Sequence, residues 1–393
     1  MRIMVHDYGG YSFPIQLSRS LAERGHDVIH VFSQSVLSPQ GSLKRRTDDP
    51  PTLSFKGISL SNIIEKQSYV KRRKQEIEYG HLLVKEVREW GPDVVLSGNT
   101  PLDTQKLLMK QCKVNDTKFI FWIQDLYGVA VDRILRKKIP LIGSMIGSYY
   151  VNLERNLLRK SEDIILITED FKKQMNRWKI DKNLHVIENW APLEDLPIRK
   201  KDNEWSRKHG LHQSKCIVYS GTLGMKHNPS LLLNLAVRFN EQNDVKVVVV
   251  SEGAGADWLK EQKEKRGLEN LLIYGFQPFD QVANVLGSAD LLVAVLEPDA
   301  GEFSVPSKVL TYHCAGKPML LSVPETNLAA KIVRRENSGK VVAPHQSEEF
   351  LNHAEELISD EITLKKMGSN ARAYAEEAFD IKRITDKFES VIG

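Results

Sequence analysis

Cysteine is scarce in this sequence, and none of its cysteines forms a paired motif. The three that occur, Cys112, Cys216 and Cys314, are far apart, and no CxxC pair exists. Such spacing supports neither a zinc site nor a disulfide framework. The sequence therefore predicts no metal site and fits a reducing compartment.

Long hydrophobic runs and a strong charge of one sign are also lacking. No apolar run reaches the roughly 18–20 residues that a membrane-spanning helix requires. The segment 1–7 lacks the basic start and the long apolar middle of a signal peptide. The net charge of +4 is too small to predict a nucleic-acid partner by itself. We therefore expect a cytoplasmic protein that binds no nucleic acid.

Short apolar runs alternate with longer amphipathic segments along the 393 residues. This alternation is typical of βαβ units around parallel sheets. In the first half we expect strands at 2–5, 27–33, 94–97, 118–123, 164–168 and 184–187, and helices at 13–24 and 77–90. In the second half we expect strands at 215–220, 245–250, 271–274, 291–295 and 319–322, and helices at 228–240, 258–266, 279–286 and 307–314.

The pattern pauses after Asn189, where prolines and the charged run 199–204 are typical of a linker. The sequence thus predicts an α/β protein with two Rossmann-like, doubly wound parallel-sheet domains. Their expected bounds are 1–190 and 191–370, followed by a helical tail at 371–393 whose packing partner the pattern leaves open. Because ligands bind at the carboxyl edges of parallel strands, we expect a central cleft that both domains face.

Two adjacent glycines, Gly9 and Gly10, lie between the first strand and the first helix. Glycines let the backbone approach a ligand closely, and the N–H groups of a helix start favour an anion. A tight turn with a purely steric need for glycine is the alternative. The GxGxxG fingerprint is absent, and 32–34 holds no acidic residue for a ribose, which disfavours a nicotinamide cofactor.

Further glycine turns follow the strands of the second half. Gly221, Gly224 and Lys226 combine an open backbone with one cation, which suits a diphosphate. Taken alone, this motif favours the alternative of a simple glycine turn with a solvated lysine. Gly253 follows the next strand, and a flat base fits against the backbone of the turn at 274–278 after the third. Their shared position at strand ends favours a nucleotide site.

The stretch 298–312 carries the clearest site pattern of the second half. A loop rich in Gly, Pro and Ser leads into a helix, with Pro306 suited to the first turn and Ser304 or Ser307 suited to capping it. The helix start offers N–H groups to a phosphate, and Lys308 adds a full charge. A capped helix with an exposed lysine is the alternative.

The order of these motifs resembles a family 4 retaining glycosyltransferase of the GT-B fold, in the branch that makes bacterial surface polysaccharides. The motifs are Gly-Gly, Arg-Gly-His-Asp-Val, Asp-Leu-Tyr, Asn-Trp-Ala-Pro, Gly-Thr-Leu-Gly, Glu-Gly-Ala-Gly, Tyr-Gly-Phe-Gln-Pro, Ser-Ala-Asp-Leu, Val-Pro-Ser-Lys and Ala-Gly-Lys-Pro. The resemblance implies an acceptor-binding N-terminal domain, a nucleotide-sugar-binding C-terminal domain and a final helix that returns to the first domain. It also implies transfer with retention and without a metal.

Residue by residue, the resemblance assigns Lys226 and Lys308 to the donor diphosphate, Glu302 to the sugar and Asp125 to the acceptor side. The implied donor-binding positions are Gly9, Gly10, Gly221, Thr222, Gly253, Phe276, Gln277, Ser304, Pro306, Ser307 and Thr311. A helix cap is the alternative role of Asp125. No cofactor is implied, and the co-substrate is a nucleoside-diphosphate sugar, with a UDP-sugar expected.

Three positions depart from the family pattern. Thr311 stands where the family has the glutamate that binds the ribose, and Phe303 stands where it has the partner glutamate, one place after Glu302. Thr222 stands where many relatives carry a phosphate-binding arginine. At Thr311 the hydroxyl is still able to bond a ribose, but the charge-assisted hydrogen bond of the glutamate is lost.

Cations and apolar residues interleave over 133–160. This pattern is typical of helices that lie on an anionic membrane, and it is equally typical of solvated amphipathic helices. The basic runs 44–46 and 71–74 extend this pattern. We therefore expect a hexosyl- or N-acetylhexosaminyl-type glycosyltransferase in polysaccharide biosynthesis, acting on a lipid-linked or other glycan at the inner membrane face. A sugar-nucleotide 2-epimerase of the same fold and a non-catalytic nucleotide-sugar-binding partner remain alternatives.

Overall fold

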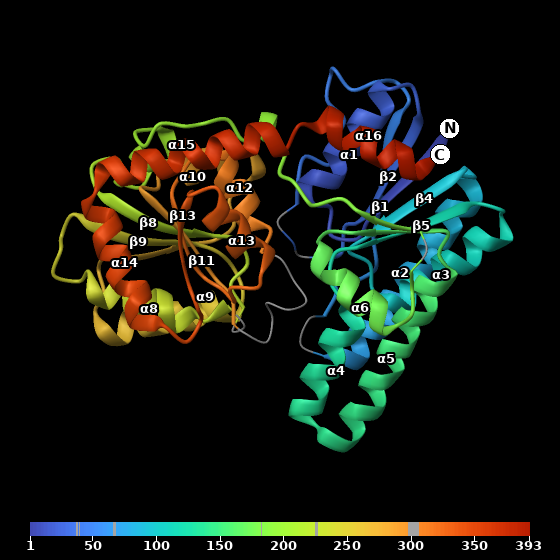
Figure 1. Cartoon of the computed structure of the whole chain (residues 1–393), viewed down its shortest axis with the longest axis horizontal. Coiled ribbons are helices and arrows are strands. Elements are labelled where there is room, and N and C mark those ends of the chain that lie inside the picture. Colours follow the sequence, from blue (N-terminus) through green and yellow to red (C-terminus); the bar gives the residue numbers. More distant parts are fainter. Residues whose placement is uncertain (37, 39, 66–67, 182, 225–226, 298–305) are drawn as a thin grey trace. The chain divides into compact units, whose positions relative to one another are not determined.

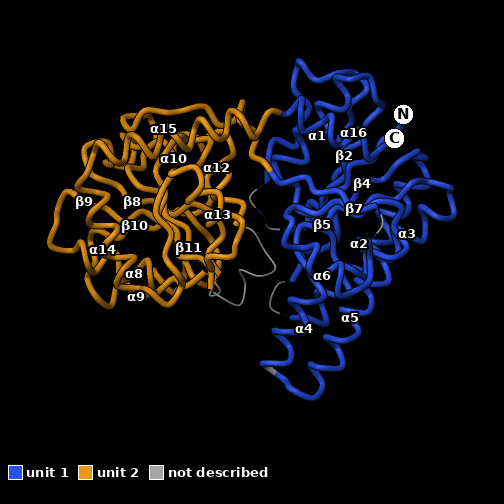
Figure 2. Tube along the Cα trace, viewed as in Figure 1, with its two compact units in different colours: residues 1–189, 381–393 blue, residues 190–380 orange. Residues whose placement is uncertain are grey.

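The structure is a computed structural model that describes residues 1–393 except 37, 39, 66–67, 182, 225–226 and 298–305. The chain forms two compact units. Unit 1 contains Met1–Asn189 and Ile381–Gly393, and unit 2 contains Trp190–Asp380, as the two colours of Figure 2 show.

Unit 1 is built on a parallel sheet in the order β3-β2-β1-β4-β5-β6-β7. The strands are β1 (Arg2–Asp7), β2 (Asp27–Ser33), β3 (Leu53–Ile58), β4 (Val94–Gly98), β5 (Lys118–Ile123), β6 (Asp163–Leu166) and β7 (Leu184–Val186). In the register of the sheet, Ile3 pairs with Val28 on one side and with Val94 on the other. The central strands are buried on both faces, which explains their nearly continuous apolar sequence.

Helices cover the sheet of unit 1 (Figure 1). They are α1 (Ser12–Glu23), α2 (Tyr69–Trp90), α3 (Leu102–Val114), α4 (Tyr127–Lys138), α5 (Pro140–Lys160), α6 (Lys172–Arg177) and α16 (Ile381–Ile392). Helices α4 and α5 form an antiparallel hairpin that extends away from the sheet in Figure 1. None of the helices, as far as the chain is described, has the length and apolar character needed to cross a membrane.

Helix α16 joins unit 1 from the far end of the chain. Its buried residues follow the spacing of one helix face: Ile384, Thr385, Phe388, Val391 and Ile392. Phe388 packs edge-on against Trp122 of β5, with 5.0 Å between ring centroids. Polar contacts fix the same helix, because the Thr385 hydroxyl donates to Ser20 Oγ over 2.8 Å.

Unit 2 repeats the architecture with a parallel sheet in the order β10-β9-β8-β11-β12-β13. The strands are β8 (Lys215–Ser220), β9 (Val245–Val250), β10 (Leu271–Tyr274), β11 (Leu291–Val295), β12 (Met319–Ser322) and β13 (Gly339–Val342). The described helices are α7 (Glu204–Lys208), α8 (Pro229–Arg238), α9 (Ala254–Arg266), α10 (Val282–Gly287), α12 (Lys308–Cys314), α13 (Leu328–Arg335), α14 (Ser347–Ser359) and α15 (Glu361–Ala378).

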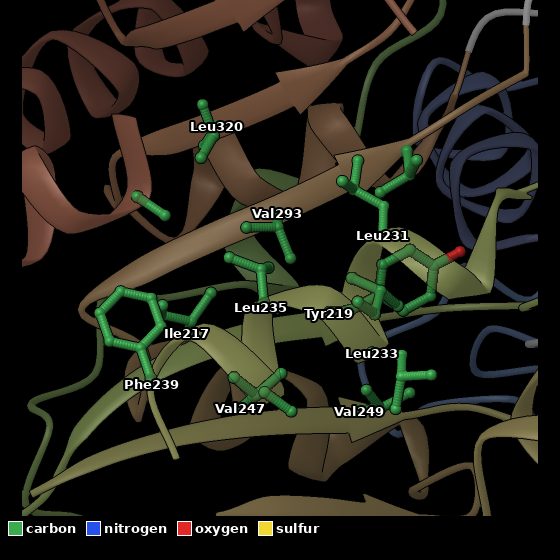
Figure 3. Close-up of a cluster of buried hydrophobic side chains, with 14 of the residues drawn as sticks. Ile217, Tyr219, Leu231, Leu233, Leu235, Phe239, Val247, Val249, Val293 and Leu320 are labelled. Carbon is green, nitrogen blue, oxygen red and sulfur yellow. The ribbon is translucent and has the colours of Figure 1, made fainter. Parts of the chain in front are cut away.

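The core of unit 2 lies between the sheet and its helices. In Figure 3, Leu231 and Leu235 of α8 stand among side chains of the strands, including Val247 and Val293. These positions are at most 1% exposed. Tyr219 belongs to the same cluster, and its hydroxyl, drawn in red, points toward the carboxyl end of β8.

The structure differs from the sequence-based expectation mainly in the edge strands of the two sheets, in the start of one helix and in one domain boundary. Strands β3 and β13 were not expected, because they are short edge strands with a half-exposed pattern rather than an apolar run. Helix α2 begins at Tyr69, eight residues before the expected 77, since its first turns are basic and solvated. The expected boundary at 371 falls within α15, and the chain passes from unit 2 to unit 1 between α15 and α16.

Candidate active site

The site features of unit 2 gather at the carboxyl ends of β8 and β11. These two strands are neighbours although they are not consecutive, which makes this the switch point of the sheet. The Lys308 ammonium, at the start of α12, donates to Tyr219 Oη over 2.7 Å and lies 4.3 Å from the centroid of the Tyr219 ring. The Tyr219 hydroxyl in turn donates to the carbonyl of Thr222 over 2.8 Å. Lys308 and the turn after β8 therefore share one hydrogen-bonded chain.

Gly221 gives Lys308 the room that it occupies. Its φ of +128° favours glycine, and an added Cβ would lie 2.9 Å from Lys308 Cε. A side chain at this position would push the cation away. Two predicted donor residues, Gly221 and Lys308, are thus brought together, and Thr222 is joined to them through Tyr219.

Tyr312, a buried residue of α12, forms hydrogen bonds to the same edge of the unit 2 sheet. Its hydroxyl accepts from the Ser220 N–H over 3.0 Å and lies 3.2 Å from the carbonyl oxygens of Ser220 and Val293. The sequence analysis missed Tyr219 and Tyr312. Aromatic residues at buried strand and helix positions are ordinary core residues in sequence, so no pattern distinguishes them.

The turns after β8 and β9 are tied to each other by backbone hydrogen bonds. The Leu223 N–H donates to the carbonyl of Glu252 over 3.3 Å, and the Gly255 N–H donates to the carbonyl of Leu223 over 3.0 Å. Gly253, with a φ of +115°, has the Leu223 carbonyl only 3.1 Å from where a Cβ would stand. Gly253 therefore lies at the same sheet edge as Gly221, as its position in the sequence predicted.

The predicted base-contacting turn after β10 is held from two sides. The Phe276 N–H donates to Glu252 Oε1 over 3.3 Å. The Gln277 side chain accepts from the indole N–H of Trp205 over 3.1 Å and donates to the carbonyl of Gly275 over 3.0 Å. Trp205, like the two tyrosines, carried no signal in the sequence.

The start of α12 differs from the expectation. Ser307 occupies the N-cap position, but its backbone is helical and its side chain makes no capping hydrogen bond, so the predicted cap is wrong for this residue. Pro306 precedes it, and its carbonyl accepts from the Val309 N–H over 3.1 Å. Thr311 is half-buried, and its hydroxyl donates to the Lys308 carbonyl over 2.8 Å. The predicted residues Lys226, Glu302, Phe303 and Ser304 lie outside the described residues.

In unit 1, Gly9 and Gly10 form the turn between β1 and α1, with Asp7 beneath it. Asp7 accepts from the Tyr11 N–H over 2.5 Å and from Asn99 Nδ2 over 2.8 Å. Burial raises the pKa of the Asp7 carboxyl to about 7, although these donors act in the opposite direction. Asp7 therefore orders the glycine turn, a role that the sequence did not reveal.

Asp125 lies at the end of β5 and is exposed. It is not the cap of α4, whose N-cap residue is Leu126. The helix start is instead contacted by Glu154 of α5, whose Oε2 accepts from the Gly128 N–H over 3.0 Å. Burial raises the pKa of Glu154 to about 8, against the lowering effect of the backbone donors at the start of α4. The capping alternative for Asp125 is thus wrong, and its predicted role toward an acceptor stays a prediction.

The α4–α5 hairpin exposes an apolar stripe. Along α5, Leu141, Ile142, Met145, Ile146 and Tyr149 are exposed, at the spacing of one helix face. The opposite face carries Gly143 and Gly147, which pack so closely on α4 that a Cβ would overlap it. The stripe therefore faces away from the partner helix, and we refer to these five residues as the α5 stripe.

Basic residues are exposed on α4 and at the start of α2. Arg133, Arg136 and Lys137 on α4 are exposed, and Arg136 pairs with Asp132 over 2.8 Å. At the start of α2, the Arg73 guanidinium lies 5.7 Å from the Tyr149 ring centroid. No group of three or more His, Cys, Asp and Glu residues that could hold a metal ion occurs where the structure is described.

Two Rossmann-like units, each a parallel sheet with its glycine turns at the carboxyl edge, define the GT-B class. Comparison with family models agrees with this class. The model of "Glycosyltransferase Family 4" matches residues 12–195, and the model of "Glycosyl transferases group 1" matches residues 201–374. The chain belongs to the family 4, group 1 glycosyltransferases.

Relatives of known sequence share this family at low identity. The chain is 23% identical over 224 residues to "Putative glycosyltransferase YtcC" of Bacillus subtilis. This match covers 52% of this chain and 53% of that protein. The chain is 22% identical over 312 residues to "Putative colanic acid biosynthesis glycosyl transferase WcaI" of Escherichia coli, which covers 77% and 74% of the two chains. The match to the first relative thus spans about half of its length.

A solved structure shows the same fold over the whole chain. Alr3699/HepE of Anabaena, in complex with UDP-glucose, superposes with a TM-score of 0.74 at 14% identity and covers 100% of this chain and 99% of its own. The fold class predicted from the sequence is therefore confirmed.

Proposed function

We propose that this protein transfers a sugar from a nucleoside-diphosphate sugar, with UDP as the expected carrier, to a hydroxyl of a glycan acceptor. The observation that carries the proposal is Lys308 at the switch point of unit 2, held beside Gly221 and hydrogen-bonded to Tyr219. A cation fixed at the carboxyl edge of such a sheet suits a diphosphate. The family membership and the UDP-glucose bound to the Anabaena neighbour support this choice of donor.

The proposed reaction proceeds with retention and needs no metal. The anomeric carbon–oxygen bond of the donor breaks, and the departing diphosphate accumulates charge that Lys308 and Lys226 stabilise. The acceptor oxygen bonds to the same carbon, and its proton passes to the leaving phosphate. The predicted sugar contact is Glu302. Transfer of a hexosyl or N-acetylhexosaminyl group is part of this proposal.

We place the acceptor on unit 1, beside Asp125, and propose that it is lipid-linked. The α5 stripe supports this choice, since Leu141 is 86% and Met145 76% exposed and the adjoining helix α4 carries exposed cations. Apolar side chains bordered by Lys and Arg suit the interface of an anionic membrane. The protein would then act peripherally at the inner membrane face in polysaccharide biosynthesis, in keeping with the name of its colanic-acid relative.

One experiment separates this function from its alternatives. The purified protein is incubated with UDP-glucose and with UDP-N-acetylglucosamine, and free UDP, free sugar and C2-epimerised sugar are measured. Slow release of UDP with the unchanged sugar supports a transferase, whereas free 2-epimer would identify an epimerase. Stabilisation against heat without turnover would indicate a non-catalytic binder, for which Thr311 in the place of the ribose glutamate is the supporting observation. If UDP, UDP-glucose and UDP-N-acetylglucosamine all fail to raise the melting temperature, the donor assignment is wrong.

A further inference from the structure

Gln277 is the side chain whose position decides how the turn after β10 presents polar groups. A glutamine amide has two N–H hydrogens and two lone pairs on its oxygen. The indole of Trp205 uses one lone pair, over 3.1 Å, and the Gly275 carbonyl uses one hydrogen, over 3.0 Å. One N–H hydrogen and one lone pair of the amide therefore remain for a ligand. Their directions are fixed, because the indole N–H holds the amide oxygen.

The group that holds Gln277 is itself rigid. Trp205 is 3% exposed, and its ring packs against Tyr274, with 5.6 Å between centroids, and against His209, with 4.5 Å. It lies on α7, whose start is closed by a reciprocal capping box between Asn203 and Ser206.

The short helix α7 is in turn anchored to α10. Asn203 Nδ2 donates to the carbonyl of Asn284 over 3.0 Å. Movement of the indole would therefore require α7 to leave its contact with α10. The hydrogen bond to Gln277 thus reaches the turn from a fixed part of the core.

One backbone donor of the turn is already engaged. The Phe276 N–H donates to Glu252 Oε1 over 3.3 Å. The Gln277 amide is then the polar side-chain group that this turn offers to a bound base, and its orientation decides where the donor and the acceptor lie.

We propose that Trp205 is a positioning residue for nucleotide-base selection: it fixes the amide of Gln277 so that one base is preferred over the others. This inference rests on the proposed function, because it places the base of the donor against the turn after β10. Without the indole N–H, only the hydrogen bond to the Gly275 carbonyl holds the Gln277 amide. The amide oxygen then has no fixed donor, so the orientation of the amide is less defined and discrimination between bases falls. The binding energy that every nucleoside diphosphate shares, through its phosphates, stays nearly unchanged.

The test compares Trp205→Phe with the wild-type protein in binding to UDP, ADP, GDP and CDP by calorimetry. Phenylalanine keeps the aromatic packing and removes the N–H group. The ratio between the dissociation constants of the weakest and the tightest base is expected to fall about tenfold, the upper range for one hydrogen bond. Gln277→Ala should lower the ratio equally, and the double variant should lower it no further, since both act through one contact.

Trp258→Phe is the matched control. Trp258 lies on α9 of the same unit and packs against a different part of the core. This variant should keep the base ratio of the wild type. An unchanged ratio in Trp205→Phe, or equal losses in both tryptophan variants, would overturn the proposal.

Two further outcomes of the experiment have their own interpretation. If Trp205→Phe does not fold, Gln277→Glu replaces it, because a carboxylate still accepts from the indole but has no N–H group for a base. An unchanged base ratio in that variant would overturn the inference. If the wild-type protein binds none of the four diphosphates, the proposed function fails, and the inference about Trp205 falls with it.

Discussion

Lys308 and Tyr219, 89 residues apart in the sequence, form a hydrogen bond of 2.7 Å in which the ammonium also lies over the phenol ring. Tyr219 is fully buried, and burial raises the pKa of its hydroxyl well above the ordinary value, so the phenol stays neutral beside the cation. The pair positions the Lys308 charge without neutralising it.

This arrangement predicts unequal effects for the two side chains. Lys308→Ala removes a charge that stabilises the leaving group and should lower kcat about ten- to a thousandfold. Tyr219→Phe removes only a hydrogen bond that orients the charge, so a loss of about three- to tenfold is expected. Steady-state rates of donor hydrolysis, with melting curves to confirm folding, measure both. A larger loss for Tyr219→Phe than for Lys308→Ala would contradict the assignment.

Thr311 offers a test of how the start of α12 faces the donor. Because this residue is half-buried and makes one hydrogen bond to Lys308, Thr311→Glu should cost only about 1 kcal/mol of stability and should keep or improve UDP affinity. Thr385→Glu is the matched control, since Thr385 is fully buried and a carboxylate there should cost several kcal/mol. Equal falls in melting temperature for the two variants would place Thr311 in the core.

Glu154 predicts a specific dependence of stability on pH. Its native pKa of about 8 lies above the ordinary value of 4.5, so the native state keeps a proton that the unfolded chain has already lost. The contribution of this group to the free energy of unfolding is therefore present below about pH 4.5 and declines as the pH rises toward 8. Glu154→Gln keeps an oxygen for the Gly128 N–H and does not titrate. Denaturant unfolding at pH 5 and pH 8 should show a smaller decline for the variant than for the wild type, and an equal decline would be inconsistent with a buried, protonated Glu154.

The α5 stripe predicts salt-sensitive binding to lipid. The double substitution of Leu141 and Met145 by serine, and separately Lys137→Glu, should each reduce sedimentation with vesicles that contain anionic lipid. Each cation near such a surface contributes about 1 kcal/mol, which salt screens. Donor hydrolysis should be unchanged in these variants.

Ile362→Ser is the control for the α5 stripe, because Ile362 is 83% exposed but lies on α15 of unit 2. It should leave vesicle binding unchanged. Failure of the wild-type protein to sediment with anionic vesicles at low salt would remove the membrane proposal and favour a soluble acceptor.

Most of the fold was predictable from sequence, because buried parallel strands such as β9, with its run of valines, carry a strong local signal. The glycine turns were predictable for the same reason, since strand ends in a parallel sheet share one edge. The supporting residues were not. Tyr312, Trp205 and Glu154 act through contacts with residues 26 to 92 positions away, and sequence pattern alone does not contain such distances. The edge strands were missed because half-exposed segments lack an apolar run.

The place of α16 in unit 1 has a consequence for biosynthesis. Residues 381–392 cover α1 and reach Trp122, yet they leave the ribosome only after all of unit 2 has been made. Unit 2, whose residues are continuous in sequence, is able to complete its core first, whereas unit 1 waits with an uncovered apolar face. Bringing α16 back to unit 1 costs conformational entropy before its contacts form, and this slows the step. The nascent first half is therefore expected to keep this apolar face uncovered until residues 381–392 have been made.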